Sequence, residues 1–446
     1  NWLALNGRIY GGELRIDWSF SGERFETTSI QRLADAYRDE LLALIAHCRV
    51  AEGQGLTPSD FPLARLDQAR LDQLPLAPCE VEDLYPLSPM QQGMLFHSLY
   101  QEAGDYINQL RVDIDGLHPE SFRAAWQAAL DEHDVLRSGF LWQGALEKPL
   151  QLVRKRVEVP FSVHDWRDRA DLAEALDALA AGEAGLGFEL AEAPLLRLVL
   201  VRTGERRHHL IYTNHHILMD GWSNSQLLGE VLQRYRGETP SRSDGRYRDY
   251  IAWLQRQDAG RTEAFWKQRL QRLGEPTLLV PAFAHGVRGA EGHADRYRQL
   301  DVTTSQRLAE FAREQKVTLN TLVQAAWLIL LQRFTGQDTV AFGATVSGRP
   351  AELRGIEEQI GLFINTLPVV ASPCPEQPIG DWLHAVQGEN LALREFEHTP
   401  LYDIQRWAGQ VGEALFDNIL VFENYPVSAA LAEETPADMR DRKSTR

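Results

Sequence analysis

The sequence has few cysteines, no long apolar segment and no excess of positive charge. Its 446 residues include 3 cysteines (Cys48, Cys79 and Cys374), which lie far apart and match no metal-binding or disulfide spacing. We therefore expect a reducing, cytoplasmic environment. No run approaches the roughly 18 apolar residues that a membrane-spanning helix needs. The 46 basic and 63 acidic residues give a net charge of −17, which argues against nucleic acid or an anionic membrane as the main partner.

The composition is that of a globular protein. Hydrophobic residues make up 44% of the chain and charged residues 24%, which is ordinary for folded domains. A length of 446 residues predicts two or three compact units. The chain begins Asn1-Trp2-Leu3, without an initiator methionine or a signal peptide. We interpret it as a piece of a longer protein.

Hydrophobic periodicity predicts a mixed α/β fold. Residues 14–20 alternate as a strand and are followed by helical spacing over 30–44, and residues 49–81 are loop-like. Helices and strands then occur on both sides of the chain midpoint, which predicts two α/β lobes. We expect helices over 121–134, 171–183, 222–235 and 318–334, and strands over 110–114, 195–201, 208–215, 339–346 and 361–370. Pro368 places the last strand at an edge or end of its sheet.

The segment 214–223, Asn-His-His-Ile-Leu-Met-Asp-Gly-Trp-Ser, joins the end of a predicted strand to the start of a helix. Successive strand residues point to opposite faces, so His215 and His216 cannot do the same job. The new helix directs its free N–H groups at this loop, where they can stabilise negative charge. A structural histidine pair with Asp220 as helix N-cap is the plainer interpretation. No further ligands stand at a metal-binding spacing, so we expect no metal site.

The pattern His-His-x-x-x-Asp-Gly at 215–221 resembles the signature of the condensation superfamily of nonribosomal peptide synthetases. Five further segments resemble motifs of that family and occur in its order, although Glu132 stands where the family often has arginine. They are Leu87–Met94, His133–Phe140, Tyr247–Tyr250, Ile360–Thr366 and His398–Leu401.

The resemblance implies an α/β fold, a V-shaped pseudo-dimer of two lobes similar to chloramphenicol acetyltransferase, with a central tunnel. It implies that upstream and downstream peptidyl carrier proteins deliver thioesters on 4'-phosphopantetheine arms. The acceptor amine would attack the donor thioester to form a peptide bond. The domain itself would bind no cofactor.

The resemblance also assigns roles to residues. His216 would be catalytic. Apart from the resemblance, the position of the helix start suggests that backbone N–H groups near Gly221 and Trp222 contact the oxyanion. His215 would support the site, and Asp220 would pair with Arg137 to fix the loop. Three further residues could line the tunnel or equally serve packing, namely Trp222, Ser223 and Asn365. We expect the histidines outside the motif to be structural: His97, His133 and His398.

Two segments refine the subtype. Ser88–His97 resembles condensation domains that join a D-configured donor to an L-configured acceptor. The first residues, from Gly11 to Cys48, resemble the end of an epimerization domain, which would supply such a donor. Epimerization and adenylation domains are then expected as neighbours, in a siderophore or lipopeptide assembly line.

The expected layout follows from these resemblances. It comprises an epimerization-domain tail over 1–60, a linker over 61–83, an N-lobe over 84–260, a C-lobe over 261–430 and an added tail over 431–446. The C-lobe is expected to be truncated after the segment 418–426. One hypothesis is that residues 1–50 fill the vacant place in the C-lobe, in cis or from another copy.

Alternative functions stay open. The nearest is an epimerization domain, because it shares the His-His-x-x-x-Asp-Gly core. Another is a catalytically silent module that only docks carrier proteins. A free-standing acyltransferase that uses coenzyme A is a third.

Overall fold

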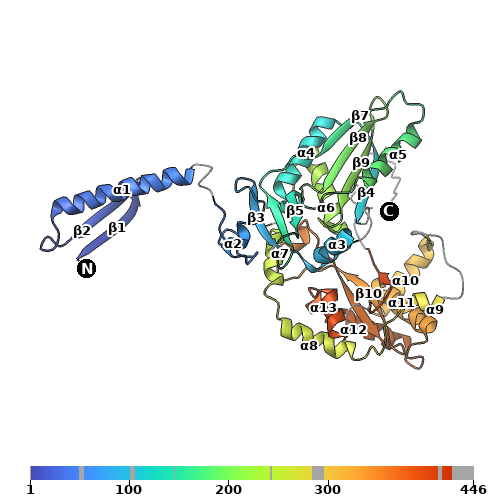
Figure 1. Ribbon diagram of the computed structural model, residues 1–446. Helices are drawn as coiled ribbons and strands as arrows, with labels where there is room; N and C mark the ends of the chain where they lie inside the picture. Colours follow the sequence, from blue (N-terminus) through green and yellow to red (C-terminus); the bar gives the residue numbers. More distant parts are fainter. Residues whose placement is uncertain are drawn as a thin grey trace. The chain divides into compact units, whose positions relative to one another are not determined.

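The computed structural model describes residues 2–49, 55–100, 106–144, 146–241, 244–283, 296–409 and 414–423. The tail expected over 431–446 lies outside these residues. The chain divides into two units (Figure 1). The first consists of Asn1–Asp60 and Leu66–Val81, and the second of Phe61–Arg65 and Glu82–Arg446.

The first unit is a hairpin with a long helix. Strands β1 (Leu3–Tyr10) and β2 (Glu13–Phe20) pair antiparallel and form a two-stranded sheet. Gly11 and Gly12 make the turn with φ of 62° and 84°, which suits glycine at both central positions of a tight hairpin. Two helices follow, α1 (Thr27–Arg49) and the short α2 (Gln68–Leu71). The alternation over 14–20 predicts β2 correctly, whereas β1 was not predicted.

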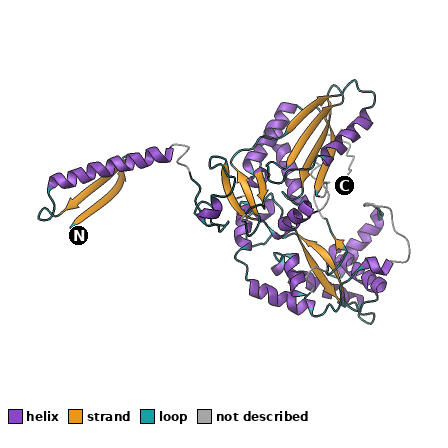
Figure 2. Ribbon diagram, viewed as in Figure 1, coloured by secondary structure: helices purple, strands orange, loops and turns teal. Residues whose placement is uncertain are grey.

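The N-terminal half of the second unit contains two sheets with helices around them (Figure 2). The larger sheet has the order β4-β9-β8-β7 and is antiparallel except for the parallel pair β7–β8. Its strands are β4 (Ile107–Asp115), β7 (Phe161–Asp165), β8 (Leu196–Arg202) and β9 (Arg207–His215). The smaller sheet consists of β3 (Val81–Pro86), β6 (Leu150–Arg154) and β5 (Ser138–Leu141), in that order.

Helices bury both faces of the larger sheet. The main core packs Trp126 of α4 and Leu227 of α6 against Leu198 and Tyr212 of the sheet. A second cluster joins Leu176 of α5 to Val199 and Ile211, whose side chains point to the opposite face. The helices are α3 (Pro89–Tyr100), α4 (Pro119–Glu132), the 3₁₀ turn η2 (Asp134–Arg137), α5 (Leu172–Gly185), α6 (Gly221–Tyr235) and α7 (Tyr247–Leu254).

The C-terminal half has one three-stranded sheet in the order β11-β10-β12. Its strands are β10 (Val340–Val346), β11 (Asn365–Ala371) and β12 (Ile419–Leu420). Trp266, Leu328, Phe342 and Val386 are central to its core. Pro368 lies in the edge strand β11, as its missing N–H predicts.

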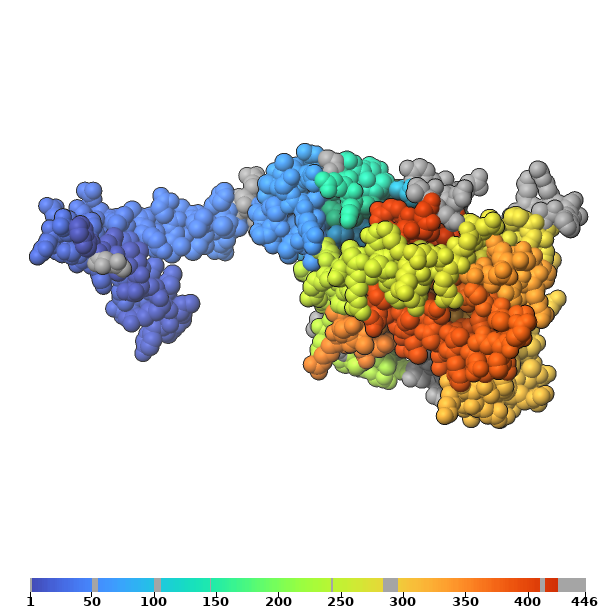
Figure 3. Space-filling model, turned by 90° about the horizontal axis from the view of Figure 1, so that it is seen from below, coloured from blue at the N-terminus to red at the C-terminus, as the bar shows by residue number. Residues whose placement is uncertain are grey.

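Helices surround this sheet, and α8 packs against α13 on the face shown in Figure 3. The elements are α8 (Ala259–Leu270), α9 (Leu279–Phe283), α10 (Val302–Glu314), α11 (Leu319–Thr335), η3 (Ile356–Glu358), α12 (Ile379–Leu393), η4 (Arg394–Phe396) and α13 (Leu401–Trp407).

The segment 359–363 carries the C-terminal half into the core of the N-terminal half. Ile360 and Leu362 belong to the core around Trp126. Phe363 packs against Tyr85 and Tyr250 in a further buried cluster. The strand predicted over 361–370 therefore begins only at Asn365, because the residues before it cross between the lobes. The other predicted helices and strands are confirmed to within a few residues.

Candidate functional site

His216 lies directly after β9, at the start of the loop that leads to α6. Its backbone N–H donates to the carbonyl oxygen of Tyr106 at 2.8 Å. Its ring Nδ1 lies 2.8 Å from the carbonyl oxygen of Met219. A carbonyl can only accept, so in the neutral ring Nδ1 carries the hydrogen and Nε2 carries the lone pair. The half-buried imidazole can therefore take up a proton at Nε2.

His215 has different surroundings. Its side chain is buried, and its Nδ1 accepts a hydrogen bond of 3.1 Å from the backbone N–H of Ile217. The rings of Tyr106 and Phe188 lie beside it. Burial, together with the neighbouring His216, lowers the pKa of His215 to about 4. His215 thus stays neutral at physiological pH and holds the loop backbone.

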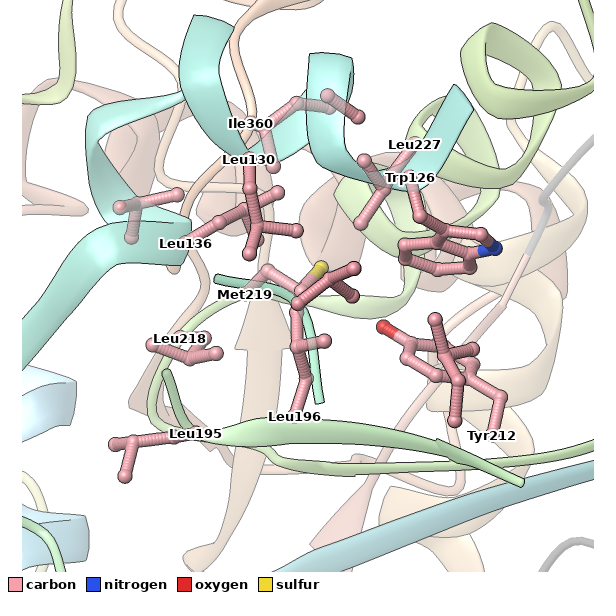
Figure 4. Packing of buried hydrophobic residues seen from close by; sticks show 14 of the residues in the cluster. Trp126, Leu130, Leu136, Leu195, Leu196, Tyr212, Leu218, Met219, Leu227 and Ile360 are labelled. Carbon is pink, nitrogen blue, oxygen red and sulfur yellow. The ribbon is translucent and has the colours of Figure 1, made fainter. Parts of the chain in front are cut away.

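Apolar side chains anchor the loop between His216 and α6. Ile217, Leu218 and Met219 are fully buried. Leu218 and Met219 lie among core residues that include Leu130 and Leu196 (Figure 4). Burying side chains of this size contributes roughly 1.5–3 kcal/mol each. The loop that carries the candidate catalytic ring is therefore fixed by the lobe's main core.

Asp220 joins the loop to the crossing segment. It is the N-cap of α6, since its Oδ1 accepts from the backbone N–H of Ser223 at 2.8 Å. Its Oδ2 accepts from the N–H of Phe363 at 3.1 Å, and its own N–H donates to the carbonyl of Gly361 at 3.1 Å. Arg349 Nη2 lies 3.5 Å from Oδ1. The carboxylate is thus buried with a cation and two backbone donors.

The predicted pairing of Asp220 with Arg137 is wrong. The Arg137 guanidinium instead bonds to Glu82 at 2.7 Å and Asp134 at 3.2 Å, and its Nε donates to the carbonyl of Leu130. These partners belong to β3, η2 and α4 of the same lobe. Arg137 therefore joins β3, η2 and α4 within the N-terminal half and does not contact the histidine loop.

The cation beside Asp220 is Arg349, which sequence reasoning did not identify. It follows β10 in the C-terminal half, and burial lowers its pKa while Asp220 opposes that shift. It also donates to Ser223 Oγ at 2.7 Å and to the carbonyl of Gln359 at 3.1 Å. No spacing pattern links position 349 to position 220, because the two meet only when both lobes are folded.

Ser223 uses its hydroxyl group inside the protein. Oγ donates to the carbonyl of Gly361 at 2.8 Å and accepts from the N–H of Gly361 at 3.1 Å, in addition to the bond from Arg349. The residue is fully buried. Of the two roles left open for Ser223, these contacts favour packing over substrate contact.

Asn365 and Trp222 also have partners within the protein. The amide nitrogen of Asn365 donates to the carbonyls of Glu397 and Thr399 at 2.8 and 2.7 Å. Trp222 Nε1 donates to the carbonyl of Glu357 at 3.1 Å. Both side chains therefore hold neighbouring segments of the C-terminal half, and the buried Asn365 again favours the packing role.

Two of the histidines outside the motif, His133 and His398, have polar partners that suit a structural role, whereas His97 is exposed and lies edge-on to the ring of Phe96. His133 Nε2 lies 2.7 Å from Glu230 Oε2. Burial lowers the pKa of His398 to about 4, and its Nε2 lies 3.3 Å from Thr262 Oγ1. Within the described residues, no cluster of His, Cys, Asp and Glu is arranged to hold a metal. Nor does the described part of the chain contain a helix with the length and apolarity of a bilayer span.

Two mixed α/β lobes around a core-anchored histidine loop form the two-lobed pseudo-dimer fold that resembles chloramphenicol acetyltransferase. Solved structures share this fold. One is a four-domain nonribosomal peptide synthetase bound to AMP and glycine, with a TM-score of 0.64 and 18% identity over 79% of this chain and 27% of that one. Another is the first condensation domain of the calcium-dependent antibiotic synthetase, with a TM-score of 0.61 and 19% identity over 76% of this chain and 79% of that one.

The condensation domain family model matches residues 81–445, and the chain belongs to that family. Among curated relatives, one of the linear gramicidin synthase proteins of Brevibacillus parabrevis is 41% identical over 97% of this chain. The chain spans only 6% of the length of that synthase protein. Condensation domains of nonribosomal peptide synthetases form peptide bonds, so the chain is an enzyme domain of the peptide-bond-forming kind.

Proposed function

We propose that this domain transfers a donor aminoacyl or peptidyl group from its thioester to the amine of an acceptor aminoacyl thioester, with His216 as the catalytic residue. Both substrates would arrive on phosphopantetheine arms of carrier proteins through a tunnel between the lobes. The observation that carries the proposal is the bond from His216 Nδ1 to the Met219 carbonyl, which leaves the Nε2 lone pair for the substrate amine.

The chemistry requires late proton removal more than a strong base. An α-amino group has a pKa of about 7.7–8.0, so a useful fraction is neutral near pH 7.5. Its attack on the thioester carbonyl forms a C–N bond and a tetrahedral intermediate with an ammonium group and an oxyanion. His216 Nε2 would accept the ammonium proton, and the C–S bond would break to release the pantetheine thiolate, which takes up a proton. Assistance of this kind is worth roughly 10²–10⁴ in rate.

The oxyanion would be stabilised at the start of α6. Gly221 is the first residue of that helix, where backbone N–H groups lack partners within the helix. The positive end of the helix dipole points the same way. A donor that contacts the oxyanion is commonly worth about 2.7–4 kcal/mol in the transition state. We therefore assign this role to the Gly221 N–H.

We further propose that the donor is D-configured and that residues 1–60 are the end of an upstream epimerization domain. The resemblance of Ser88–His97 to that subtype supports the first point. For the second, the alignment with the linear gramicidin synthase relative extends over 97% of this chain, which is more than residues 81–445. Much of the preceding segment thus has a counterpart there. Carrier, epimerization and adenylation domains of one cytoplasmic synthetase would be the partners.

The decisive experiment loads the flanking carrier domains and follows product by mass spectrometry. A peptide formed from two loaded carriers, and formed faster with a D- than with an L-donor, is the expected result. His216→Ala should lower the turnover by at least about 10². Unchanged turnover would remove His216 from the mechanism. Racemization on one loaded carrier without peptide would instead identify an epimerization domain, and carrier binding without any product would identify a docking module.

A further inference from the structure

A chain of buried, uncharged polar side chains ends at the loop that carries His216. Gln151 Nε2 donates to Ser138 Oγ at 2.8 Å, and Gln151 Oε1 accepts from Gln91 Nε2 at 2.9 Å. Gln91 Nε2 also donates to the carbonyl oxygen of Ile217 at 3.3 Å. Ser138, Gln151 and Gln91 are all fully buried. The chain therefore connects β5 and β6 of the small sheet, through α3, to the residue that follows His216.

Gln91 is held rigidly at its own end. It lies in the first turn of α3, where its Oε1 accepts from the backbone N–H of Ser88 at 2.9 Å. In return, Ser88 Oγ accepts from the N–H of Gln91 at 3.3 Å. This reciprocal pair fixes the glutamine head before it reaches the loop. Both hydrogens of its amide nitrogen are then directed at acceptors, one of which is the Ile217 carbonyl.

Ile217 lies in the loop between the catalytic histidine and the residue whose carbonyl oxygen orients the histidine ring. His216 supplies the imidazole, and Met219 supplies the carbonyl that holds Nδ1. On one side of Ile217, its N–H is held by His215 Nδ1. On the other side, its carbonyl is held by Gln91. Leaving a buried carbonyl without a donor costs about 1–3 kcal/mol, which is enough to turn a peptide plane in a loop.

We propose that Gln91 is a positioning residue for catalysis. Through the Ile217 carbonyl it fixes the loop that sets the direction of His216 Nε2, and it does so without contacting substrate. The inference rests on the proposed role of His216. It predicts that loss of the Gln91 donor lowers turnover through His216, while binding of the loaded carriers is unaffected.

Gln91→Glu removes the donor selectively. A carboxylate at this position still accepts from the Ser88 N–H. The Gln151 amide can rotate to donate to it, at the loss of its bonds to Ser138 Oγ and to the Tyr85 hydroxyl. The Ile217 carbonyl then faces a carboxylate. At pH 8 we expect kcat to fall by about 10–100-fold with KM for both loaded carriers unchanged, because misplacement of about 1 Å can cost that much. As the pH falls and the carboxyl takes up a proton, it can donate again, so the deficit relative to the native domain should shrink.

Gln127→Glu is the matched control. Gln127 also donates from Nε2 to a part-buried backbone carbonyl, that of Val157 at 2.8 Å, and accepts from the N–H of Val159 at 2.9 Å. It lies in α4, away from the histidine loop. Because Gln127 is only partly buried, its substitution should lower stability by less than Gln91→Glu does, and it should leave kcat within about twofold of the native value.

A double-mutant cycle with His216→Ala separates positioning from a general loss of stability. If Gln91 acts through His216, Gln91→Glu should cost little further activity in the His216→Ala background. An equal loss in both backgrounds, or native kcat in a folded Gln91→Glu protein, would overturn the inference. Should that variant not fold, the isosteric Gln91→Met takes its place in the same cycle. Full activity of His216→Ala alone would instead overturn the proposed function.

Discussion

Arg349 and Asp220 meet across the two halves of the second unit, with Nη2 3.5 Å from Oδ1 and only 4% and 1% of their side chains exposed. One belongs to the segment after β10, and the other caps α6 directly behind the histidine loop. A buried charge without its partner is costly. The geometry of the loop therefore depends on both lobes being folded together.

Asp220→Ala should lower the yield of soluble, folded protein before it affects chemistry. Removing one partner of a buried pair costs roughly 3–5 kcal/mol, and this variant also loses the N-cap of α6. Urea denaturation of the milder Asp220→Asn and of Arg349→Met measures the cost. The double variant should be more stable than the sum of the two single effects implies, because no charge is left unpaired.

Arg137→Met provides the control for this pair. Arg137 bonds to Glu82 and Asp134 instead, so its effect and that of Asp220→Asn should add within about 0.5 kcal/mol. Coupling of Asp220 to Arg137 in place of Arg349 would contradict the observed pairing. An Asp220→Asn protein of native stability that makes no peptide would place Asp220 in the chemistry.

These residues also show what the sequence could predict. The start of α6 was predictable because Asp220 and Gly221 precede a run of apolar residues at helical spacing. The different surroundings of His215 and His216 were predictable because strand residues alternate in direction. Such patterns are local. The partner of Asp220 was not predictable, since 129 positions separate it from Arg349 and no periodicity connects them. The contact of Gln91 with Ile217, 126 positions apart, was missed for the same reason.

Stability should fall as the medium is acidified below about pH 6.5. Burial lowers the pKa of His215 from 6.5 to about 4, so the unfolded chain takes up a proton in this range and the folded chain does not. The stability that this neutral histidine contributes is present above pH 6.5 and is lost as the pH falls toward 4. His398, whose pKa burial also lowers to about 4, acts in the same direction.

Urea denaturation between pH 5 and 7 measures this effect. One such group changes the free energy of unfolding by at most about 1.4 kcal/mol per pH unit. His215→Asn keeps an acceptor near the Ile217 N–H and removes the titrating group. The free energy of unfolding of this variant should therefore change less steeply with pH, by up to about 1.4 kcal/mol per pH unit. Burial raises the pKa values of Asp83 and Asp134, and these carboxyls give a slope of the opposite sign. Identical slopes for the native protein and His215→Asn would show that His215 is charged in the folded state at these pH values.

The variant Ser223→Ala tests whether the residues at the start of α6 bind substrate or hold the lobes together. The buried Ser223 hydroxyl bonds to Arg349 and to both backbone groups of Gly361. Ser223→Ala removes the acceptor of the Gly361 N–H, whereas the Gly361 carbonyl keeps the Asp220 N–H and Arg349 keeps Asp220. We therefore expect a loss of about 1–3 kcal/mol in the free energy of unfolding, the cost of one unsatisfied group. KM for both loaded carriers should stay unchanged. Ser225→Ala is the control, since Ser225 in the same helix donates only to the carbonyl of Gly221. A raised KM for one carrier substrate, with stability unchanged, would mean that the Ser223 hydroxyl reaches the substrate, and that the loop moves away from Gly361 when substrate binds.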